Sequence, residues 1–558
     1  MIVLGLSGTF HDAAAALLVD GELVAFAQEE RFSRRKNDAN LPVRAAAFCL
    51  RQAGITAADL DLVAWHEKPL LKLERVLLTS LRTWPHAATS FRRAMVSMVG
   101  DKLWMRSHLV NALGVDPRRV VFAGHHASHA AAALGASPFE DAAVLCVDGV
   151  GEWATTSTWD GTAPLGELHF PHSIGLLYSV FTAFLGFEVN EGEYKVMGLA
   201  AMGQPRYREA LDQVIERHRD GSFTLKLEHF RFHLDPDRAW APSFEAVFGA
   251  PRPPGAPIEE RHRDIAASIQ ELTEELLLDL AARLHARTGK TKLCLGGGVA
   301  LNCVAVGRIL REGPYDDVFV MPAAGDAGSA LGAALIAAGG SGPPLRAPLA
   351  HAAWGADLDP AAVRRFLVDG GVAFREVADP AVEAAERLAK GQIIGWMQGR
   401  FEMGPRALGQ RSILADPRNV ATRDRLNLKV KHREAFRPFA PSVLAEASPW
   451  LFDLPRGGGH ARRFMTATVR ARDPALLSAA LHVDGTARVQ EVHADTQPIY
   501  ARLLTEVGAR TGIPAVVNTS FNLAGEPMVA SVADGWSTFL RTDIDALVIG
   551  PFVMERPA

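Results

Sequence analysis

The sequence is poor in cysteine, and the few cysteines it has are not grouped. Four occur among 558 residues, and none forms a CxxC pair. Cys146 and Cys294 lie within apolar runs. We therefore interpret the cysteines as buried core thiols in a reducing compartment rather than as a disulfide framework.

Two further absences concern charge and apolar length. Lys and Arg number 59 against 63 Asp and Glu, a net charge of −4, so there is no overall basic field for nucleic acid. No apolar run is long enough to cross a bilayer, and the first residues lack the basic and apolar regions of a signal peptide. These absences predict a cytoplasmic protein with no nucleic-acid partner and no membrane partner. The length alone favours three or four domains.

A repeated pattern is present in the first 161 residues. Residues 2–7 predict a strand, 7–12 a polar turn, 13–19 a second strand and 20–21 an Asp-Gly turn. Residues 142–147, 148–152, 153–159 and 160–161 repeat this order. The repeat predicts an α/β fold with two pseudo-symmetric halves and a cleft between them. That is the layout of the actin–sugar kinase–Hsp70 (ASKHA) fold, in which facing turns grip a nucleotide.

Two histidines and two aspartates form a candidate metal site. His125 and His129 are four residues apart, which places both side chains on one face of a helix. Asp148 follows a predicted strand, and Asp326 lies in a second Gly-rich turn. HxxxH spacings are common and most bind nothing, but the Asp-Gly turns favour a ligand site. This donor set suits iron(II), manganese or zinc, and the sequence does not choose among them.

Glycine-rich turns after predicted strands are candidates for binding a nucleotide. A strand at 292–295 leads into three glycines, and Asn302 opens the next helix. A long amphipathic helix is predicted over 262–288. The residues expected to contact the nucleotide are Gly149, Gly151, Glu152, Gly297, Gly298, Asn302 and Gly325.

Three other segments of the front part have a distinctive composition. Residues 29–36 are charged, which indicates a solvated loop or a contact with an anion. Residues 66–115 are rich in Leu, Trp, Phe and Met; we expect most of these side chains in a helical core and a few lining a pocket for an apolar acceptor. Residues 220–260 are rich in Pro and charge and predict a surface excursion.

The character of the chain changes after a Pro- and Gly-rich stretch at 337–350, which we interpret as a domain linker. A strand at 391–397 then runs into a span rich in arginine, at positions 400, 406, 411, 418, 423, 425 and 437. A solvent-exposed face would carry more Asp and Glu residues among the arginines than this span does. A nucleic-acid surface is modestly supported by Phe401, Phe436 and Phe439. A pocket for a small polyphosphate fits the glycines and prolines best.

With these motifs the chain resembles the O-carbamoyltransferases of antibiotic and nodulation-factor biosynthesis over essentially its whole length. The most specific motifs are FHDAAAAL, EERFSRRK, HHxSHA, DGxGE, GEYKVMGLA, GGGVALN, GDxGSALGAA, GPRALGxRSI, KxREAFRPFAP and VNTSFN. The resemblance implies an ASKHA domain over 1–345, like the metal-binding threonylcarbamoyl-transfer protein. It implies a YrdC-like α/β domain over 351–558, like the threonylcarbamoyl-adenylate synthase.

The reaction implied by the resemblance has two halves. Carbamoyl phosphate and ATP, bound with Mg²⁺, give carbamoyl-adenylate, and the carbamoyl group then passes to an alcohol. The candidates for binding the first pair of substrates are Arg406, Lys431, Arg437, Arg488 and Asn518.

The resemblance also suggests roles in the front domain. The metal, iron(II) by resemblance, would grip phosphate oxygens and polarise the carbamoyl group. His11 is the candidate general base, with Asp12 orienting it. Lys36 would close over the adenylate phosphate, and His126 would pack or support the metal ligands.

The sequence also bears on the chemical class of the acceptor and on two alternative functions. A polycationic acceptor calls for an acidic pocket, whereas residues 66–115 are apolar and basic, so a polyketide macrolide, an ansamycin or a similar hydrophobic alcohol is favoured. A small-molecule kinase on the same fold would have no use for the arginine-rich second domain. Threonylcarbamoyl-type tRNA modification would require salt-sensitive tRNA binding, which the net charge of −4 disfavours.

Overall fold

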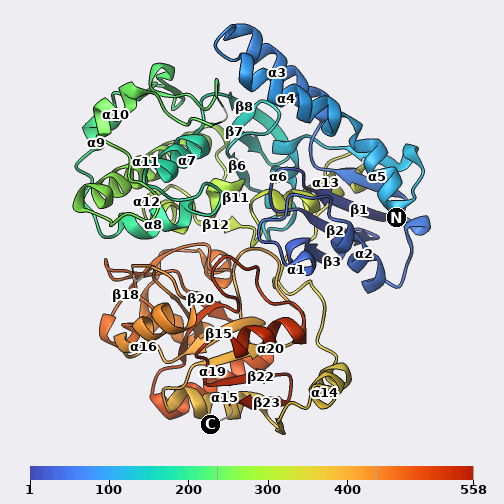
Figure 1. Ribbon diagram of the computed structural model, residues 1–558, viewed down its shortest axis with the longest axis vertical. Coiled ribbons are helices and arrows are strands. Elements are labelled where there is room, and N and C mark those ends of the chain that lie inside the picture. Colours follow the sequence, from blue (N-terminus) through green and yellow to red (C-terminus); the bar gives the residue numbers. More distant parts are fainter. Residues whose placement is uncertain (236, 435, 557–558) are drawn as a thin grey trace.

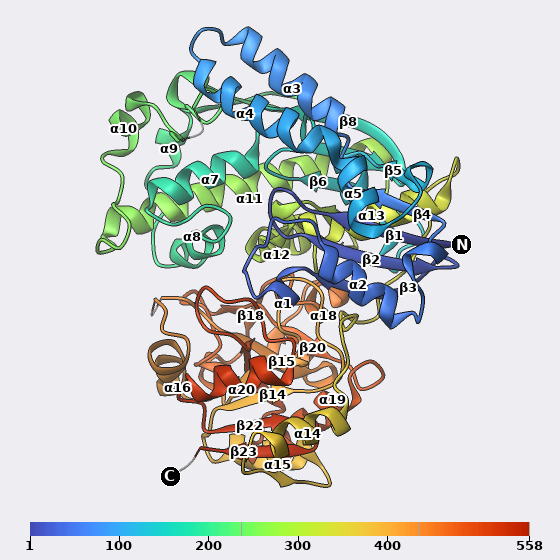
Figure 2. The same cartoon turned by 45° about the vertical axis from the view of Figure 1, so that its right-hand side comes forward.

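Two five-stranded sheets with the same topology form the front part of the chain (Figures 1 and 2). The computed structural model describes residues 1–235, 237–434 and 436–556. In each sheet three antiparallel strands are followed by two parallel ones. The first has the order β3-β2-β1-β4-β5 and the second β8-β7-β6-β11-β12. This confirms the mixed α/β class and the predicted duplication.

The strands lie close to their predicted positions because each is a short apolar run ended by a polar turn. The central strands have both faces buried, as expected beneath covering helices. The bounds are β1 Ile2–Ser7, β2 Ala14–Val19, β3 Glu22–Gln28, β4 Leu62–Trp65 and β5 Val120–Phe122, then β6 Ala143–Val147, β7 Ala154–Asp160, β8 Ala163–His169, β11 Lys292–Gly296 and β12 Asp317–Val320.

Two helices made largely of small residues pack between the sheets and carry three of the four candidate metal ligands. They are α6 (His125–Gly135) and α13 (Asp326–Gly339). A side chain at Gly332 would place its Cβ 1.8 Å from the carbonyl oxygen of Ser128, so this contact requires glycine. The close approach brings the N-terminal ends of both helices to the cleft.

The remaining helices of the front part lie around the two sheets (Figure 1). The predicted helix over 262–288 is confirmed as α11 (Glu260–Thr288), and Asn302 caps the next helix through its side chain. The other bounds are α1 Glu30–Ser33, α2 Val43–Gln52, α7 Ile174–Phe184, α8 Glu193–Ala200, α9 Arg208–Leu211, α10 Pro242–Phe248 and α12 Cys303–Glu312, with a small sheet of β9 (Ile215–Arg217) and β10 (Phe223–Leu225).

The segment over 220–260 is not the surface excursion that its composition predicts. Phe223, Phe230, Phe244 and Phe248 are each at most 2 % exposed. They pack with Phe181 of α7 and with α11 in one core. The prolines and charges lie in the connections, and the aromatic side chains between them anchor the segment.

Residues 66–115 form a helical hairpin that projects from the front part (Figures 1 and 2). Its helices are α3 (Pro69–Arg82), α4 (Ala88–Gly100) and α5 (Met105–Leu113). Met98 and Met105 are buried, whereas Leu70, Trp84 and Trp104 are more than half exposed. The expectation of a helical core is therefore wrong for most of these side chains.

The rear part is built on an eight-stranded mixed sheet of order β13-β23-β22-β14-β15-β21-β16-β20. The predicted linker over 337–350 begins inside α13, which continues to Gly339. The bounds are β13 Arg375–Glu376, β14 Ile394–Met397, β15 Arg411–Ala415, β16 Ala440–Leu444, β17 Phe452–Asp453, β18 Val469–Ala471, β19 Thr486–Ala487, β20 Gln490–Val492, β21 Ala515–Ser520, β22 Ala546–Ile549 and β23 Phe552–Glu555, with helices α14 Pro360–Asp369, α15 Pro380–Ala389, α16 Val420–Arg425, α17 Ser448–Leu451, α18 Gly459–Arg463, α19 Pro498–Thr511 and α20 Val532–Leu540.

Among the described residues, no helix is both long enough and apolar enough to cross a membrane.

Candidate active site

Two histidines and two aspartates converge at the cleft between the front sheets. His125 and His129 extend from the first turns of α6, Asp148 follows β6, and Asp326 is the first residue of α13. One ligand atom from each of the four lies within 4.8 Å of all the others. His125 Nε2 is 3.0 Å from Asp148 Oδ2 and 3.1 Å from His129 Nε2. The structure thus brings together the four residues that the sequence singles out.

The chemistry of this cluster fits a divalent cation. Burial by itself lowers the pKa of His129, but Asp148 and Asp326 outweigh it and raise that pKa to about 9. The two imidazoles in turn hold the pKa of Asp148 well below its usual range. Two anionic carboxylates and two ring nitrogens in so small and buried a space are a donor set for iron(II), manganese or zinc.

The first turn of α6 is held by Glu152. Both oxygens of this carboxylate accept hydrogen bonds from the backbone N–H of His125, at 3.0 and 3.1 Å. A carboxylate at a helix N-terminus satisfies free N–H groups and complements the helix dipole. Gly151 packs on the ring of His125, and Gly297 packs on Val147. Glu152, Gly151 and Gly297 do not line either of the two cavities described below, so their predicted contact with a nucleotide is corrected to support of the candidate metal ligands and of the strand that precedes Asp148.

His11 and Asp12 lie beside the cluster as a pair. His11 Nδ1 is 3.1 Å from Asp12 Oδ2, and His11 Nε2 is 3.9 Å from Asp326 Oδ2. Burial lowers the pKa of His11, but Asp326 and Asp12 raise it to about 10. The imidazole is therefore charged while Asp326 keeps its full negative charge beside it. His126 Nδ1 is 2.9 Å from Ser157 Oγ, and its ring packs beside the rings of His125 and His129, with centroids 5.9 and 6.2 Å away, as expected for a residue that packs against the cluster.

A cavity of about 420 Å³ opens in front of the cluster. His11, Asp12, Lys36, Asp148 and Asp326 line it, together with Gly149, Gly298, Asn302 and Gly325 of the nucleotide prediction. Much of the remaining wall is apolar and comes from Phe10, Val150, Leu176, Val189, Val299, Leu301 and Met528. No residue of 66–115 lines it, so the predicted role of that segment in lining a pocket is wrong.

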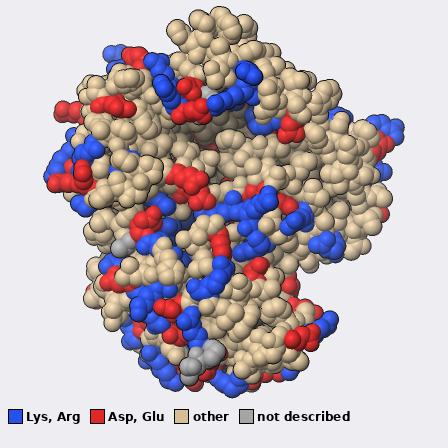
Figure 3. All heavy atoms as spheres, viewed as in Figure 1, with Lys and Arg blue, Asp and Glu red and all other residues tan. Residues whose placement is uncertain are grey.

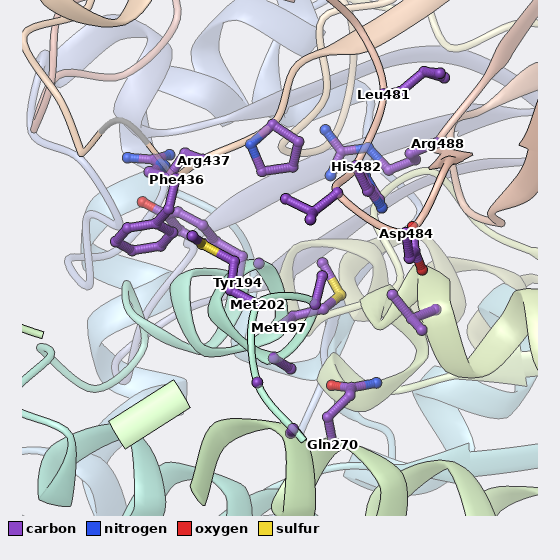
Figure 4. Close-up of a pocket in the computed structure, with 18 of the residues that line it drawn as sticks. Tyr194, Met197, Met202, Gln270, Phe436, Arg437, Leu481, His482, Asp484 and Arg488 are labelled. Carbon is purple, nitrogen blue, oxygen red and sulfur yellow. The ribbon is translucent and has the colours of Figure 1, made fainter. Parts of the chain in front are cut away.

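A second cavity, of about 490 Å³, lies where the front and rear parts meet (Figure 4). Seven arginines line it: Arg308 and Arg311 of α12, and Arg406, Arg423, Arg433, Arg437 and Arg488 of the rear part. In Figure 4, Phe436 and Arg437 lie on one side and His482 and Arg488 on the other, with Tyr194 and Met197 of α8 between them. Figure 3 shows Lys and Arg gathered across the middle of this face of the molecule.

The electrostatics of the second cavity favour an anion. Burial first, and then the neighbouring Arg488, lower the pKa of Arg406 to about 9. Burial and Arg437 lower the pKa of Arg433 to about 9 as well. The Nε atoms of Arg406 and Arg488 are buried and have no hydrogen-bond partner among the described residues. Phosphate oxygens would satisfy such donors and relieve the repulsion between the guanidinium groups.

The two cavities adjoin. Tyr194, Met197 and Arg406 line both of them. Arg437 lies over the ring of Tyr194, with its guanidinium carbon 4.7 Å from the ring centroid. Lys195 of the same helix donates to Glu434 of the rear part at 2.9 Å. Helix α8 is therefore the partition between the metal cluster and the arginine-lined cavity.

Two residues predicted to bind substrate in the rear part have other contacts. Lys431 Nζ is bonded to oxygens of Ser520 and Asn522, and burial holds its pKa well below the usual value. Asn518 donates to Ala407, Ser442 and Gln490 inside the sheet. Neither residue lines a cavity, so both predictions are corrected to internal anchoring. Similarly, Lys36 lines the first cavity but is paired with Glu191 at 3.1 Å.

The arginines of the arginine-rich span have two kinds of surroundings: some line the second cavity, and the others are bonded within the protein. Arg406, Arg423 and Arg437 line the second cavity. Arg400 and Arg411 bond to backbone carbonyls, and Arg418 and Arg425 pair with acids. Sequence reasoning missed Arg308 and Arg311 because they lie in the front part, outside the arginine-rich span. Their spacing of three on a helix after the triple glycine is a signal that would place them on one face.

Comparisons with known proteins agree with this division. A family model described as carbamoyltransferase N-terminus matches residues 2–335, and one described as carbamoyltransferase C-terminus matches residues 385–556. An uncharacterised protein of Synechocystis is 43 % identical over all of this chain and 97 % of its own length. The nodulation protein NolNO of Sinorhizobium fredii is 40 % identical over 99 % of this chain and 80 % of its own length. The 3′-hydroxymethylcephem-O-carbamoyltransferase of Amycolatopsis lactamdurans is 36 % identical over 54 % of this chain and 56 % of its own length. This chain belongs to the carbamoyltransferase family.

Proposed function

We propose that this protein is an ATP-dependent O-carbamoyltransferase whose two adjoining cavities perform successive halves of one transfer. The observation that supports this most is the pair of cavities itself: one contains a carboxylate–imidazole cluster, the other seven arginines, and they share Tyr194, Met197 and Arg406. We keep residues 1–345 and 351–558 as the two domains, the second YrdC-like. The ASKHA-like front half supplies α8 and α12 to the shared boundary.

The first half-reaction is assigned to the arginine-lined cavity. Carbamoyl phosphate and ATP with Mg²⁺ together carry many negative charges, and the guanidinium groups of Arg406, Arg437 and Arg488 would hold them close together. Water takes the phosphoryl group of carbamoyl phosphate, releasing phosphate. The resulting carbamate oxygen displaces pyrophosphate from the α-phosphorus of ATP, which gives carbamoyl-adenylate.

The second half-reaction is assigned to the metal cluster. A divalent ion held by His125, His129, Asp148 and Asp326 would supply a Lewis acid; iron(II) is implied by the family resemblance. The acceptor hydroxyl attacks the carbamoyl carbon, and AMP departs. His11 is in position to take the hydroxyl proton once the charge of Asp326 is neutralised, with Asp12 fixing the imidazole. Turnover that persists in His11→Asn would remove His11 from this role.

Carbamoyl-adenylate must cross from one cavity to the other before water destroys it. Tyr194→Ala is expected to open the boundary, so that AMP forms at a near-normal rate while less carbamoylated product appears. We expect the ratio of product to AMP to fall several-fold. Tyr194→Phe keeps the ring that contacts Arg437 and should keep the ratio near the wild-type value. An unchanged ratio in Tyr194→Ala would show that the tyrosine is not the barrier.

The wall of the first cavity favours an uncharged, partly apolar acceptor. Its carboxylates outside the metal cluster are largely paired: Glu30 with Arg31, Glu191 with Lys36, Glu526 with Arg541 and Asp12 with His11. Glu193 has no ion-pair partner among the described residues, but it accepts hydrogen bonds from the Ser179 hydroxyl and the backbone N–H of Asn190. A polycation would find little free negative charge there. A polyketide macrolide or ansamycin alcohol fits this wall.

The proposed function is tested by incubation with ATP, carbamoyl phosphate and a panel of natural-product alcohols. Mass spectrometry should detect AMP, pyrophosphate and an added carbamoyl group. We expect kcat/KM for an uncharged macrolactone alcohol to exceed that for a polyamino sugar by at least about 10-fold, the gap that about 1.4 kcal/mol produces. Formation of ADP instead of AMP would favour a kinase, and preference for the polyamino sugar would contradict the acceptor class.

A further inference from the structure

Helix α3 exposes several large apolar side chains on its outward face. Leu70 is 73 % exposed, Leu81 is 71 % exposed, and Trp84 in the following turn is 62 % exposed. Leu71 is 41 % exposed, and Leu78 on the same side of the helix is only half-buried. The residues buried on this helix are Pro69 and Ser80. In Figure 3 the top of the molecule, where Figure 1 places this hairpin, is largely uncharged.

The spacing of these residues is that of a helix–helix seam. Leu71, Glu74, Leu78 and Leu81 follow one another at intervals of three, four and three. This is the repeat by which one helix packs its side chains between those of a second helix. An exposed apolar stripe with this repeat marks an interaction surface rather than an ordinary solvent face.

The charges on this face identify the partner. Glu74 and Arg82 are exposed and have no ion-pair or hydrogen-bond partner among the described residues. Each is four residues from Leu78, on opposite sides of it. If two α3 helices pair antiparallel about a twofold axis at Leu78, Glu74 of each copy lies beside Arg82 of the other. A bilayer offers Glu74 no such cation, and a carboxylate in the middle of the stripe opposes insertion.

We propose that α3 is the contact through which two copies of this chain form a symmetric dimer, with Leu71, Leu78 and Leu81 as its apolar core and reciprocal Glu74–Arg82 pairs across the contact. The proposal is independent of the carbamoyl-transfer reaction. Two hydrogen bonds fix the base of the hairpin to the loop that follows β6. Arg75 donates to the carbonyl oxygen of Gly151 at 2.9 Å, and the backbone N–H of Lys68 donates to the Glu152 carboxylate at 2.8 Å.

Sedimentation velocity of the full chain tests the proposal. We expect a species of twice the 60.1 kDa chain mass at micromolar concentration. Glu74→Arg or Arg82→Glu alone should weaken association at least 10-fold by placing like charges together, and the double variant should restore it. Leu78→Glu should give monomers, because it places two carboxylates together at the axis, whereas Val368→Glu, at a site 61 % exposed on α14, should not. A monomeric wild type, or single variants that dimerise as well as wild type, would overturn the proposal.

A cysteine at the proposed axis provides a second measurement that does not depend on affinity. All four native cysteines are buried, so Leu78→Cys introduces an accessible thiol into a chain that otherwise has none among its described residues. Mild oxidation should link two copies of Leu78→Cys through one disulfide, and Val368→Cys should remain unlinked. Equal linking in both variants would indicate random collision. No linking of Leu78→Cys in a dimeric sample would place the dimer contact elsewhere. Either result contradicts an axis at Leu78.

Discussion

Asp148→Asn should abolish delivery of the carbamoyl group while AMP and pyrophosphate continue to form. Asp148 Oδ2 lies 3.0 Å from His125 Nε2 and 3.6 Å from His129 Nε2, at the centre of the cluster. Asparagine keeps the shape but removes the negative charge that a divalent ion needs. Loss of a group that only supports a ligand costs up to about 100-fold in metal affinity, and a direct ligand should cost at least that much.

The measurement has two independent readouts. Bound metal is counted by elemental analysis, and the carbamoylated acceptor and AMP are followed in the same reaction. Asp141→Asn is the matched control, because Asp141 precedes the same strand at its other end and its side chain is 66 % exposed. Full metal content together with full transfer in Asp148→Asn would show that this cluster is not a metal site.

Arg406→Met should have the opposite effect: AMP formation falls sharply, and the fold is as stable as wild type or more so. Arg406 lines both cavities, and burial and Arg488 already oppose its charge in the absence of an anion. A hydrogen bond to a charged group contributes about 1.5–3 kcal/mol, so losing one contact to phosphate should reduce kcat/KM by roughly 10- to 150-fold. Methionine removes the repulsion and keeps much of the volume.

Arg411→Met is the variant whose stability should be compared with that of Arg406→Met. Arg411 is fully buried, and its guanidinium group donates hydrogen bonds to the backbone carbonyl oxygens of Gln398 and Gln410. Methionine cannot donate to these buried acceptors, and each acceptor left without a donor costs about 1–3 kcal/mol. Chemical denaturation should therefore find Arg411→Met destabilised and Arg406→Met not. Equal destabilisation of both variants would mean that Arg406 is structural, and full AMP formation in Arg406→Met would remove it from substrate binding.

Local patterns predicted the strands of the two front sheets and the convergence of the four candidate metal ligands because both depend on short-range rules. An apolar run followed by an Asp-Gly turn marks a buried strand wherever it occurs, and four-residue spacing on a helix fixes which histidines share a face. Asp326 could be added because its turn repeats the features of the turn after Asp148. In these cases the chemistry lies at the ends of regular elements.

The errors arose where the same residue types serve two purposes. Lys431 and Asn518 suit an anion, but the structure uses their donors on neighbouring carbonyl and amide oxygens. Phe230 and Phe244 come from a stretch whose composition indicates a surface, yet they pack into a core with α7 and α11. For residues 66–115, an amphipathic pattern is identical whether its apolar face turns inward or outward. Only long-range packing decides these cases.

The arginine-lined cavity has one further consequence, for how this protein must be assembled. Arg308 and Arg311 come from α12, while Arg433 and Arg488 come from the rear part, so neither part alone has the complete lining. Covalent continuity through residues 340–350 keeps the two parts at a high effective concentration. If the chain were cut there, the two parts would have to associate as separate molecules. For an enzyme encoded by two split genes, the rate of the first half-reaction would then fall when the protein is diluted.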